Sequence, residues 1–369
     1  MKILHILEAT QGGTRRHVLD LLPAFVRQGF ACDLIYSPLR YPAFARDAVK
    51  LEKQGVRCRA IPMARGFGGA HDAQAFGALR AHLQANTYDV IHCHSTKAGF
   101  LGRLAAPWKT PVVYTPHCIA FDTSLPRLQR RAARLIEKLL AHRTAHFIAV
   151  ARHEARVIRR VGLCSPQKLS VIYNGIDLEE FDKIQNSKFK IQNSRLTIGC
   201  FGRLTRQKNQ AALLRALPAV RRAVPQAQLL LVGSGEDEAN LRALAVHLNI
   251  NQAVTFTGEI EEARPYYARC DIVAQPSRWE GCPYSILEAM AAKCPVVATS
   301  VGGVPEVLQA PGGVVYSAAG PETLAEPLIA LAHDKTGRLR MGEAARARIE
   351  SHFTAAQMVE QTMQVYDRL

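Results

Sequence analysis

Short apolar runs alternate with amphipathic segments along the whole chain, and this alternation is the strongest constraint on its fold. Buried parallel strands have nearly continuous apolar sequences, and a crossover helix must separate each strand from the next. We therefore expect an α/β protein with one parallel sheet in each half of the chain. Strands are predicted at residues 3–7, 31–36, 90–94, 112–116 and 145–150, and then at 197–201, 228–232, 254–257, 272–274 and 296–299. Helices are predicted at 17–28, 98–106, 209–220, 238–248, 285–292 and 323–334.

The length of 369 residues favours two domains over one. We predict a Rossmann-like N-terminal domain over residues 1–172, a linker over 173–196 and a second Rossmann-like domain over 197–345. A C-terminal helical segment, residues 346–369, is expected to return to the first domain. Two such domains would face each other across a cleft, where ligands usually bind.

A seven-residue tandem repeat occupies residues 183–196 of this linker. Two copies are too few for a stable coiled coil, so we interpret the repeat as a polar surface insertion.

The positive charge of the chain is concentrated in its first half. Residues 1–165 contain 25 Lys and Arg against 10 Asp and Glu, whereas the remaining residues contain 22 against 21. Such a surface favours an anionic partner, which could be acidic lipid, polyphosphate or nucleic acid. Residues 127–138 also combine arginines with apolar residues at helical spacing. That pattern is typical of a membrane-surface helix, or of a core-facing helix with a solvated cationic side.

The nine cysteines are scattered and form no C-x-x-C pair, which argues against a zinc site of that kind and against a disulfide framework. The N-terminal residues show no signal peptide, and no apolar run is long enough to span a bilayer. We therefore expect a cytoplasmic protein, either free or peripheral on the inner face of the cytoplasmic membrane.

The most informative motif is E-G-C-P-Y-S-I-L-E, in which Glu280 and Glu288 flank a turn that opens a helix. The first turn of a helix presents free backbone N–H groups, which favour an anion. Glu288, further along the helix, could accept hydrogen bonds from sugar hydroxyls.

A second motif, G-R-L-T-R-Q-K-N, follows a predicted strand and carries Arg203 and Lys208. Two fixed cations could stabilise the charge that grows on a departing nucleoside diphosphate without a metal. No Asp-x-Asp occurs in the chain. We therefore expect no metal ligands and no cofactor.

Together these motifs resemble those of the retaining glycosyltransferase family 4, which has the GT-B fold, and the resemblance extends over essentially the whole chain. It implies that Glu280 contacts the transferred sugar and Glu288 the nucleotide ribose, and that Arg203 and Lys208 bind the donor diphosphate. Tyr284 and Ser285 could donate their backbone N–H groups to the donor, whereas Pro283, at a position where the family usually has glycine, cannot.

Further donor-binding residues are expected in glycine loops. Gly12 and Gly13 follow the first strand, where glycine lets the backbone approach a phosphate closely, and they match a Gly-Gly loop of the family. Gly233 and Gly258 resemble family loops that line the nucleotide.

His117, at the end of a predicted strand, matches a family histidine beside the reacting sugar. The segment H-C-H-S-T-K-A-G resembles members that build bacterial surface polysaccharides, so His94 and Lys97 are expected on the acceptor side. We also expect His92 and His94 to point to opposite faces of their strand and therefore not to share a metal.

The resulting hypothesis is a retaining, metal-independent transferase that moves a sugar from a nucleotide-diphosphate sugar to a lipid-linked or polysaccharide acceptor at an anionic membrane surface. UDP is favoured over GDP because the resemblance is to polysaccharide-assembly members. Two alternatives remain: a nucleotide-sugar epimerase or hydrolase with the same architecture, and a basic protein that binds nucleic acid or membrane without catalysis. Nucleic acid is not expected as a partner, because the chain lacks a recognisable nucleic-acid motif.

Overall fold

The computed structural model describes residues 1–66, 68–123, 125–185, 195–317 and 320–369. The chain forms two compact units, one made of Met1–Asn174 with Ala355–Leu369 and the other of Gly175–Thr354. The sequence-based boundary at residue 172 falls just before the first division and that at 345 falls before the second, whereas the predicted linker over 173–196 belongs almost entirely to the second unit. Residues 186–194, which contain most of the tandem repeat, lie outside the described residues.

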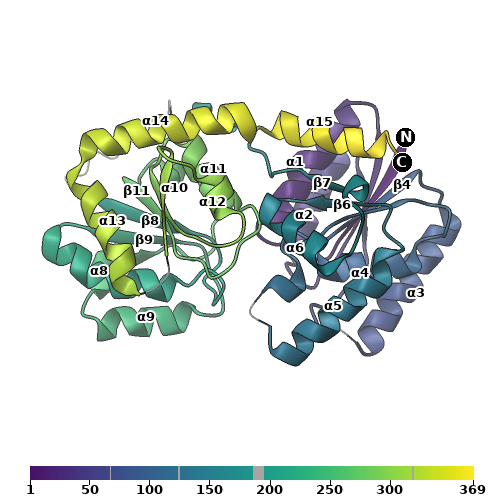
Figure 1. The fold of residues 1–369 in the computed structure, drawn as a ribbon, viewed down its shortest axis with the longest axis horizontal. Coiled ribbons are helices and arrows are strands. Elements are labelled where there is room, and N and C mark those ends of the chain that lie inside the picture. Colours follow the sequence, from purple (N-terminus) through teal and green to yellow (C-terminus); the bar gives the residue numbers. More distant parts are fainter. Residues whose placement is uncertain (67, 124, 186–194, 318–319) are drawn as a thin grey trace. The chain divides into compact units, whose positions relative to one another are not determined.

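The first unit contains a seven-stranded parallel sheet in the order β3-β2-β1-β4-β5-β6-β7 (Figure 1). Its strands are β1 (Lys2–Leu7), β2 (Ala31–Tyr36), β3 (Arg57–Ala60), β4 (Val90–His94), β5 (Val112–Thr115), β6 (His146–Ala149) and β7 (Leu169–Val171). The main helices are α1 (Gly13–Arg27), α2 (Phe44–Lys53), α3 (Ala70–Ala85), α4 (Thr96–Ala105), α5 (Arg127–Ala141), α6 (Arg152–Val161) and α15 (Ala355–Tyr366).

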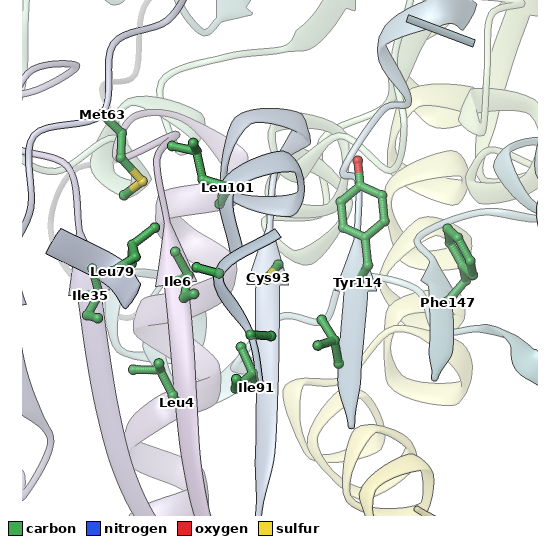
Figure 2. Packing of buried hydrophobic residues seen from close by; sticks show 14 of the residues in the cluster. Leu4, Ile6, Ile35, Met63, Leu79, Ile91, Cys93, Leu101, Tyr114 and Phe147 are labelled. Carbon is green, nitrogen blue, oxygen red and sulfur yellow. The ribbon is translucent and has the colours of Figure 1, made fainter. Parts of the chain in front are cut away.

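Helices cover both faces of this sheet, because alternate residues of each strand point to opposite sides. Leu4, Ile6, Ile91 and Cys93 pack against α3, α4 and α6 on one face, and Figure 2 shows this layer. The other face packs against α1, α2 and α15. Of the C-terminal segment 346–369 that is predicted to return to the first domain, residues 355–369 belong to that unit, with Tyr366 of α15 buried in its core, and residues 346–354 belong to the second unit.

The second unit contains a six-stranded parallel sheet in the order β10-β9-β8-β11-β12-β13. Its strands are β8 (Thr197–Phe201), β9 (Gln228–Val232), β10 (Val254–Phe256), β11 (Ile272–Gln275), β12 (Val296–Thr299) and β13 (Gly313–Tyr316). Its helices are α7 (Leu178–Gln185), α8 (Gln210–Ala223), α9 (Glu238–His247), α10 (Arg264–Tyr267), α11 (Tyr284–Ala291), α12 (Val304–Val307), α13 (Pro321–His333) and α14 (Lys335–His352). Helices α8, α9 and α13 bury their apolar sides against one face, and α11 packs on β11 and β12.

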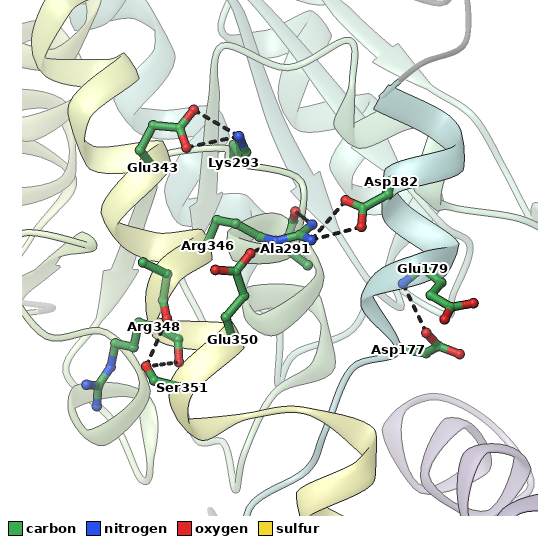
Figure 3. A network of polar contacts seen from close by, with 11 residues as sticks. Asp177, Glu179, Asp182, Ala291, Lys293, Glu343, Arg346, Arg348, Glu350 and Ser351 are labelled. Atoms are coloured by element: carbon green, nitrogen blue, oxygen red, sulfur yellow. Dashed lines mark hydrogen bonds and ion pairs between the residues drawn. The ribbon is translucent and has the colours of Figure 1, made fainter.

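A polar network fixes the end of α11, the helix that carries Glu288 (Figure 3). The Arg346 guanidinium, on α14, donates a hydrogen bond to the carbonyl of Ala291 at 3.0 Å. The same guanidinium pairs with Asp182 of α7 at 2.9 Å and with Glu350 at 2.8 Å. The Arg346 side chain is only 9% exposed, although its carboxylate partners Asp182 and Glu350 are each 53% exposed, and its contacts join three helices.

The ten strands predicted from the sequence are present, five with the predicted ends and the others within one residue of them at each end. The three that the sequence did not predict, β3, β7 and β13, all lie at the edges of sheets. Edge strands have one unpaired side and need no continuous apolar run, as the sequence Arg-Cys-Arg-Ala of β3 illustrates. Apolar periodicity therefore predicts the interior of each sheet better than its borders.

Candidate functional site

The sequence motifs of the second unit meet at the carboxyl edge of its sheet. The loop after β8 carries Arg203 and Lys208, and the loop after β11 carries Glu280. In a parallel sheet the carboxyl ends of neighbouring strands share one edge, where ligands are usually bound. Lys208 Nζ lies 2.7 Å from Glu280 Oε1, with side chains 16% and 7% exposed. The predicted cation and the predicted sugar-contacting carboxylate are thus direct neighbours.

Glu280 is held in place by the backbone around it. A Cβ added to Gly302 would lie 1.7 Å from the carbonyl oxygen of Glu280, so only glycine allows this approach of the loop after β12. Gly303 also donates its backbone N–H to Gly281 at 3.1 Å. Gln207 donates to the carbonyl of Trp279 at 3.0 Å, which ties the two motif-bearing loops together. The carboxylate is therefore positioned before any ligand binds.

The two predicted nucleotide-loop glycines are also adjacent. Gly233 and Gly258 form an antiparallel bridge between the loops after β9 and β10. A Cβ on Gly233 would lie 2.4 Å from the carbonyl oxygen of Gly202, so the loop after β8 is close as well. Arg203, on that same loop, is partly exposed, and its carbonyl accepts a hydrogen bond from the Gln210 side chain at 2.9 Å.

The helix after Glu280 begins at Tyr284, with Pro283 at the capping position. Ser285 therefore lies in the first turn, as the sequence predicted. Glu288 lies one turn further and accepts a hydrogen bond from the Tyr267 hydroxyl at 2.9 Å. Burial, together with the nearby Glu288 carboxylate, raises the pKa of Tyr267 well above its usual value, so this phenol remains a donor at neutral pH.

In the first unit, Gly12 and Gly13 lie at the start of α1, which begins four residues before the helix predicted at 17–28. Gly12 has φ 71° and Gly13 is the first residue of the helix, and both are exposed. The first turn of α1 contains no acidic side chain, so none of its own residues neutralises the positive end of the helix dipole.

His117 and Cys118 lie in the loop after β5, with positive φ values of 57° and 105°. Both backbone conformations are strained for residues other than glycine. The Glu154 carboxylate stabilises the loop, because it accepts hydrogen bonds from the backbone N–H groups of Cys118 and Val150, each at 2.9 Å. Burial raises the pKa of Glu154 to about 7, an effect that these backbone donors oppose.

His117 belongs to a buried cluster with His5, His17, His92 and His94. His94 Nδ1 lies 3.2 Å from His117 Nε2, and His94 Nε2 lies 3.1 Å from His5 Nδ1. The rings of His17 and His117 are 4.6 Å apart and nearly perpendicular. Desolvation by burial lowers the pKa of all five, to about 3 for His5 and about 4 for His17. Repulsion from neighbouring histidines lowers the pKa values of His5, His92, His94 and His117 further, whereas the hydrogen bond to Asn174 opposes the shift of His17. All five are neutral at pH 7.

The expectation that His92 and His94 point to opposite faces is wrong. Residues two apart in a strand share a face, and the two rings are 4.0 Å apart. Both lie on the side of the sheet that packs against α1 and α15, where His92 contacts the Tyr366 hydroxyl at 2.5 Å and the Thr115 hydroxyl at 2.8 Å.

Lys97, predicted on the acceptor side together with His94, is 2% exposed, and its ammonium pairs with both carboxylate oxygens of Asp72 at 2.7 Å. An acceptor could reach this ammonium only by displacing Asp72 or by using the remaining donor capacity of Lys97.

Sequence reasoning missed His5, His17 and Glu154. His5 lies directly opposite His92 in the β1–β4 pairing. Histidines in two predicted strands that pair with each other are therefore the sequence signal that could have revealed the cluster. His17, on α1, and Glu154, on α6, reach the same region only through the packing of helices on the sheet, which one sequence does not encode locally.

Comparison with known proteins supports an assignment that the fold and these loops already suggest. Residues 11–180 match the family model described as Glycosyltransferase Family 4, and residues 195–334 match the model described as Glycosyl transferases group 1. Most of the chain is thus covered by two models that correspond to the two units.

Individual relatives agree with this result. The chain is 27% identical over 318 residues to the UDP-Gal:alpha-D-GlcNAc-diphosphoundecaprenol alpha-1,3-galactosyltransferase of Escherichia coli, covering 82% of this chain and 80% of that protein. It is 36% identical over 197 residues to the GDP-mannose-dependent monoacylated alpha-(1-6)-phosphatidylinositol monomannoside mannosyltransferase of Corynebacterium glutamicum, covering 49% and 51%.

Among solved structures, Anabaena HepE in complex with UDP and glucose superposes with a TM-score of 0.82 at 22% identity, over all of both chains. A similarity at this level of identity establishes the fold. Taken with the two matched models and the sequence relatives, it shows that the chain is a glycosyltransferase of family 4 with the GT-B fold.

Proposed function

We propose that this enzyme transfers a sugar from a UDP-sugar to a lipid-linked or polysaccharide acceptor, with retention of configuration and without a catalytic metal. The observation that carries the proposal is the contact between Lys208 and Glu280. A lysine ammonium has three donors, of which Glu280 uses one at 2.7 Å and the side-chain oxygen of Gln275 a second at 3.2 Å. The third donor could bind a diphosphate while Glu280 accepts from the sugar beside it.

In the proposed reaction, Arg203 and Lys208 stabilise the charge that grows on the departing diphosphate. The backbone N–H groups of Tyr284 and Ser285 add hydrogen bonds at the start of α11. Glu288 would bind the ribose, and the glycine loops at Gly233 and Gly258 would let the nucleotide approach the backbone.

The first unit would contribute the acceptor side. Gly12 and Gly13 are proposed to approach the donor phosphates, and His117 to lie beside the reacting sugar. His94 and Lys97 would then be positioned towards the acceptor, His94 through its 3.2 Å contact with His117. The acceptor hydroxyl would attack from the face that the diphosphate leaves, and the departing phosphate would take its proton.

Two of the similar proteins support a UDP-sugar, and not a GDP-sugar, as the donor. The Escherichia coli relative, which matches over most of both chains, is named for UDP-Gal and a diphosphoundecaprenol acceptor. HepE was solved with UDP and glucose. The Corynebacterium glutamicum relative is named for GDP-mannose, but its match extends over about half of each chain.

A transfer assay tests the proposal directly. Purified protein would be incubated with UDP-sugars or GDP-sugars and an undecaprenyl-diphosphate-linked saccharide, and the product linkage would be determined by NMR. We expect transfer from a UDP-sugar, with the anomeric configuration of the donor kept in the product. Free sugar or an epimer formed at a rate that the acceptor does not change would instead indicate a hydrolase or an epimerase.

The surface of α5 favours docking on an anionic membrane. Leu128, Leu135 and Leu139 are 79%, 58% and 60% exposed, and arginines and a lysine are exposed beside them. The one acidic residue of α5, Glu137, is buried in an ion pair with Arg103 at 2.8 Å, so the exposed side of the helix carries only positive charge. Among the described helices, none is both long and apolar enough to cross a bilayer.

We expect the triple change of Leu128, Leu135 and Leu139 to Ser to weaken binding to phosphatidylglycerol vesicles by about 100-fold or more, because each leucine contributes roughly 1–2 kcal/mol on partial burial in lipid. Co-sedimentation of purified protein with vesicles would measure the effect. Leu339→Ser, at an exposed leucine of the second unit, is the matched control and should bind normally. Equal binding of the triple variant and the control would contradict docking through α5.

A further inference from the structure

The buried histidine cluster of the first unit contains two overlapping groups of three imidazoles. One nitrogen from each of His17, His94 and His117 lies within 4.8 Å of the other two, and the same holds for His5, His92 and His94. Neither group includes a carboxylate. Imidazole nitrogens without oxygen ligands suit Zn²⁺, Cu²⁺, Ni²⁺ and Co²⁺, and they suit Mg²⁺ and Ca²⁺ poorly.

We propose that His17, His94 and His117 form a binding site for a transition-metal dication such as Zn²⁺, with a fourth position open to a water or another ligand. Two nitrogens that bind one tetrahedral Zn²⁺ lie about 3.3 Å apart, given Zn–N bonds of about 2.0–2.1 Å. His94 Nδ1 and His117 Nε2 are already 3.2 Å apart. Only His17 would have to approach, by no more than roughly 1.5 Å.

The surroundings of two of these ligands fix which nitrogen is available. The side-chain oxygen of Asn174 accepts a hydrogen bond from His17 Nδ1 at 3.0 Å, so His17 presents the lone pair of Nε2. His94 can donate from Nε2 to His5 Nδ1 at 3.1 Å, which leaves the Nδ1 lone pair for the metal. A histidine that binds a metal usually donates its second N–H to such an oxygen or nitrogen acceptor, which orients the ring.

The ionisation state of the cluster agrees with this geometry. Burial lowers the pKa of His17 to about 4, and the pKa values of His94 and His117 are also well below their usual range. A metal would therefore meet neutral imidazoles at pH 7 and would not have to displace protons from them.

The second group of three is less suitable. Both nitrogens of His92 already have partners, Tyr366 and Thr115, at 2.5 and 2.8 Å. A metal bound by His5, His92 and His94 would have to break one of these contacts inside the core. The group with His17 loses only the contact between its own members, His94 Nδ1 and His117 Nε2, and keeps the contacts of His17 with Asn174 and of His94 with His5. We therefore assign the site to this group.

Calorimetric titration of the purified, chelator-stripped full chain with Zn²⁺ tests this assignment. We expect one Zn²⁺ per chain in the wild-type protein and a loss of affinity of at least about 100-fold in His17→Ala. Asn174→Ala, which removes the hydrogen bond that orients His17, should lose about 10- to 100-fold. Co²⁺ in place of Zn²⁺ should give the intense visible absorption of a tetrahedral site. Circular dichroism would establish that each variant is folded.

His71→Gln is the matched control, because His71 is an exposed histidine of the same unit. It should bind one Zn²⁺ as tightly as the wild-type protein. No stoichiometric binding to the wild-type protein, unchanged binding in both His17→Ala and Asn174→Ala, or loss of binding in His71→Gln would each overturn the assignment.

A bound dication would also occupy the imidazoles of His94 and His117. The proposed function places His117 beside the reacting sugar. On that basis, Zn²⁺ should inhibit sugar transfer over the concentration range in which it binds. Binding without inhibition would leave the metal site intact and would contradict the placement of His117.

Discussion

Lys208→Gln is expected to lower the rate of sugar transfer by about 100- to 1,000-fold, the usual effect of removing one group that stabilises a developing anion. Glutamine can still donate a hydrogen bond to Glu280, which Lys208 contacts at 2.7 Å, but it carries no charge to offset that of the diphosphate. The loss should therefore appear in kcat, measured with saturating donor. Arg203→Gln should behave similarly.

Stability must be separated from catalysis in this experiment, since removing one partner of a largely buried ion pair can destabilise the fold by several kcal/mol. Thermal unfolding of each variant would define the temperatures at which it is folded. Lys293→Gln is the matched control, because Lys293 also pairs with a glutamate, Glu343, at 2.9 Å but is 39% exposed. It should keep full activity. Wild-type activity in folded Lys208→Gln would refute the role of this lysine.

Mild acid should destabilise the first unit. Five histidines, four of them buried, are neutral in the folded state, and burial holds the pKa of His5 near 3 and that of His17 near 4. The unfolded chain has histidine pKa values near 6.5, so it binds more protons as the pH falls below that value, and stability falls with it. At pH 5 His5 and His17 cost about 2 kcal/mol each, about 4 kcal/mol together, and the lowered pKa values of His92, His94 and His117 add to this loss.

One neighbouring carboxyl group acts in the opposite direction. The pKa of Glu154 is raised to about 7 in the folded state, so the folded state takes up a proton between pH 7 and pH 5, before the unfolded state does. This proton uptake stabilises the folded state by roughly 2–3 kcal/mol. The net effect is still a loss of stability, because His5 and His17 alone cost more than Glu154 returns, and a typical domain has only about 5–15 kcal/mol of stability in total.

Urea unfolding at pH 7, 6 and 5 would measure this dependence. We expect His5→Leu to lose about 2 kcal/mol less than the wild-type protein between pH 7 and pH 5, because one titrating group is gone. His71→Gln, at an exposed histidine, should follow the wild-type curve. Equal unfolding free energies of the wild-type protein at pH 5 and pH 7 would show that the cluster is not buried in its neutral form.

The two loops that carry Lys208 and Glu280 could be located from sequence because each is a local motif at the end of a buried strand. Lys208 and Glu280 are 72 residues apart, yet their strands, β8 and β11, are neighbours, so a parallel sheet brings their loops to one edge. The interior strands were predictable for the same reason, since burial on both faces requires continuous apolar sequence.

The histidine cluster could not be assembled in this way. Its members come from β1, α1, β4 and the loop after β5, and they meet only once α1 packs on the sheet. Even within one strand, the faces of His92 and His94 were wrongly assigned. The conformation of His117 depends on Glu154, which lies 37 residues further along the chain. The buried carboxylate of Glu154 accepts a hydrogen bond from the backbone N–H of Cys118, the residue after His117. Such tertiary contacts leave no periodic signal.

The central claim is that two cationic side chains, Arg203 and Lys208, and not a divalent ion, make the diphosphate a competent leaving group. The most direct test is the initial rate of transfer by the wild-type enzyme, stripped of metal and assayed with EDTA, compared with the rate in added Mg²⁺ or Mn²⁺. We predict equal rates. A rate that falls to background in EDTA and returns when Mg²⁺ or Mn²⁺ is restored would contradict the claim.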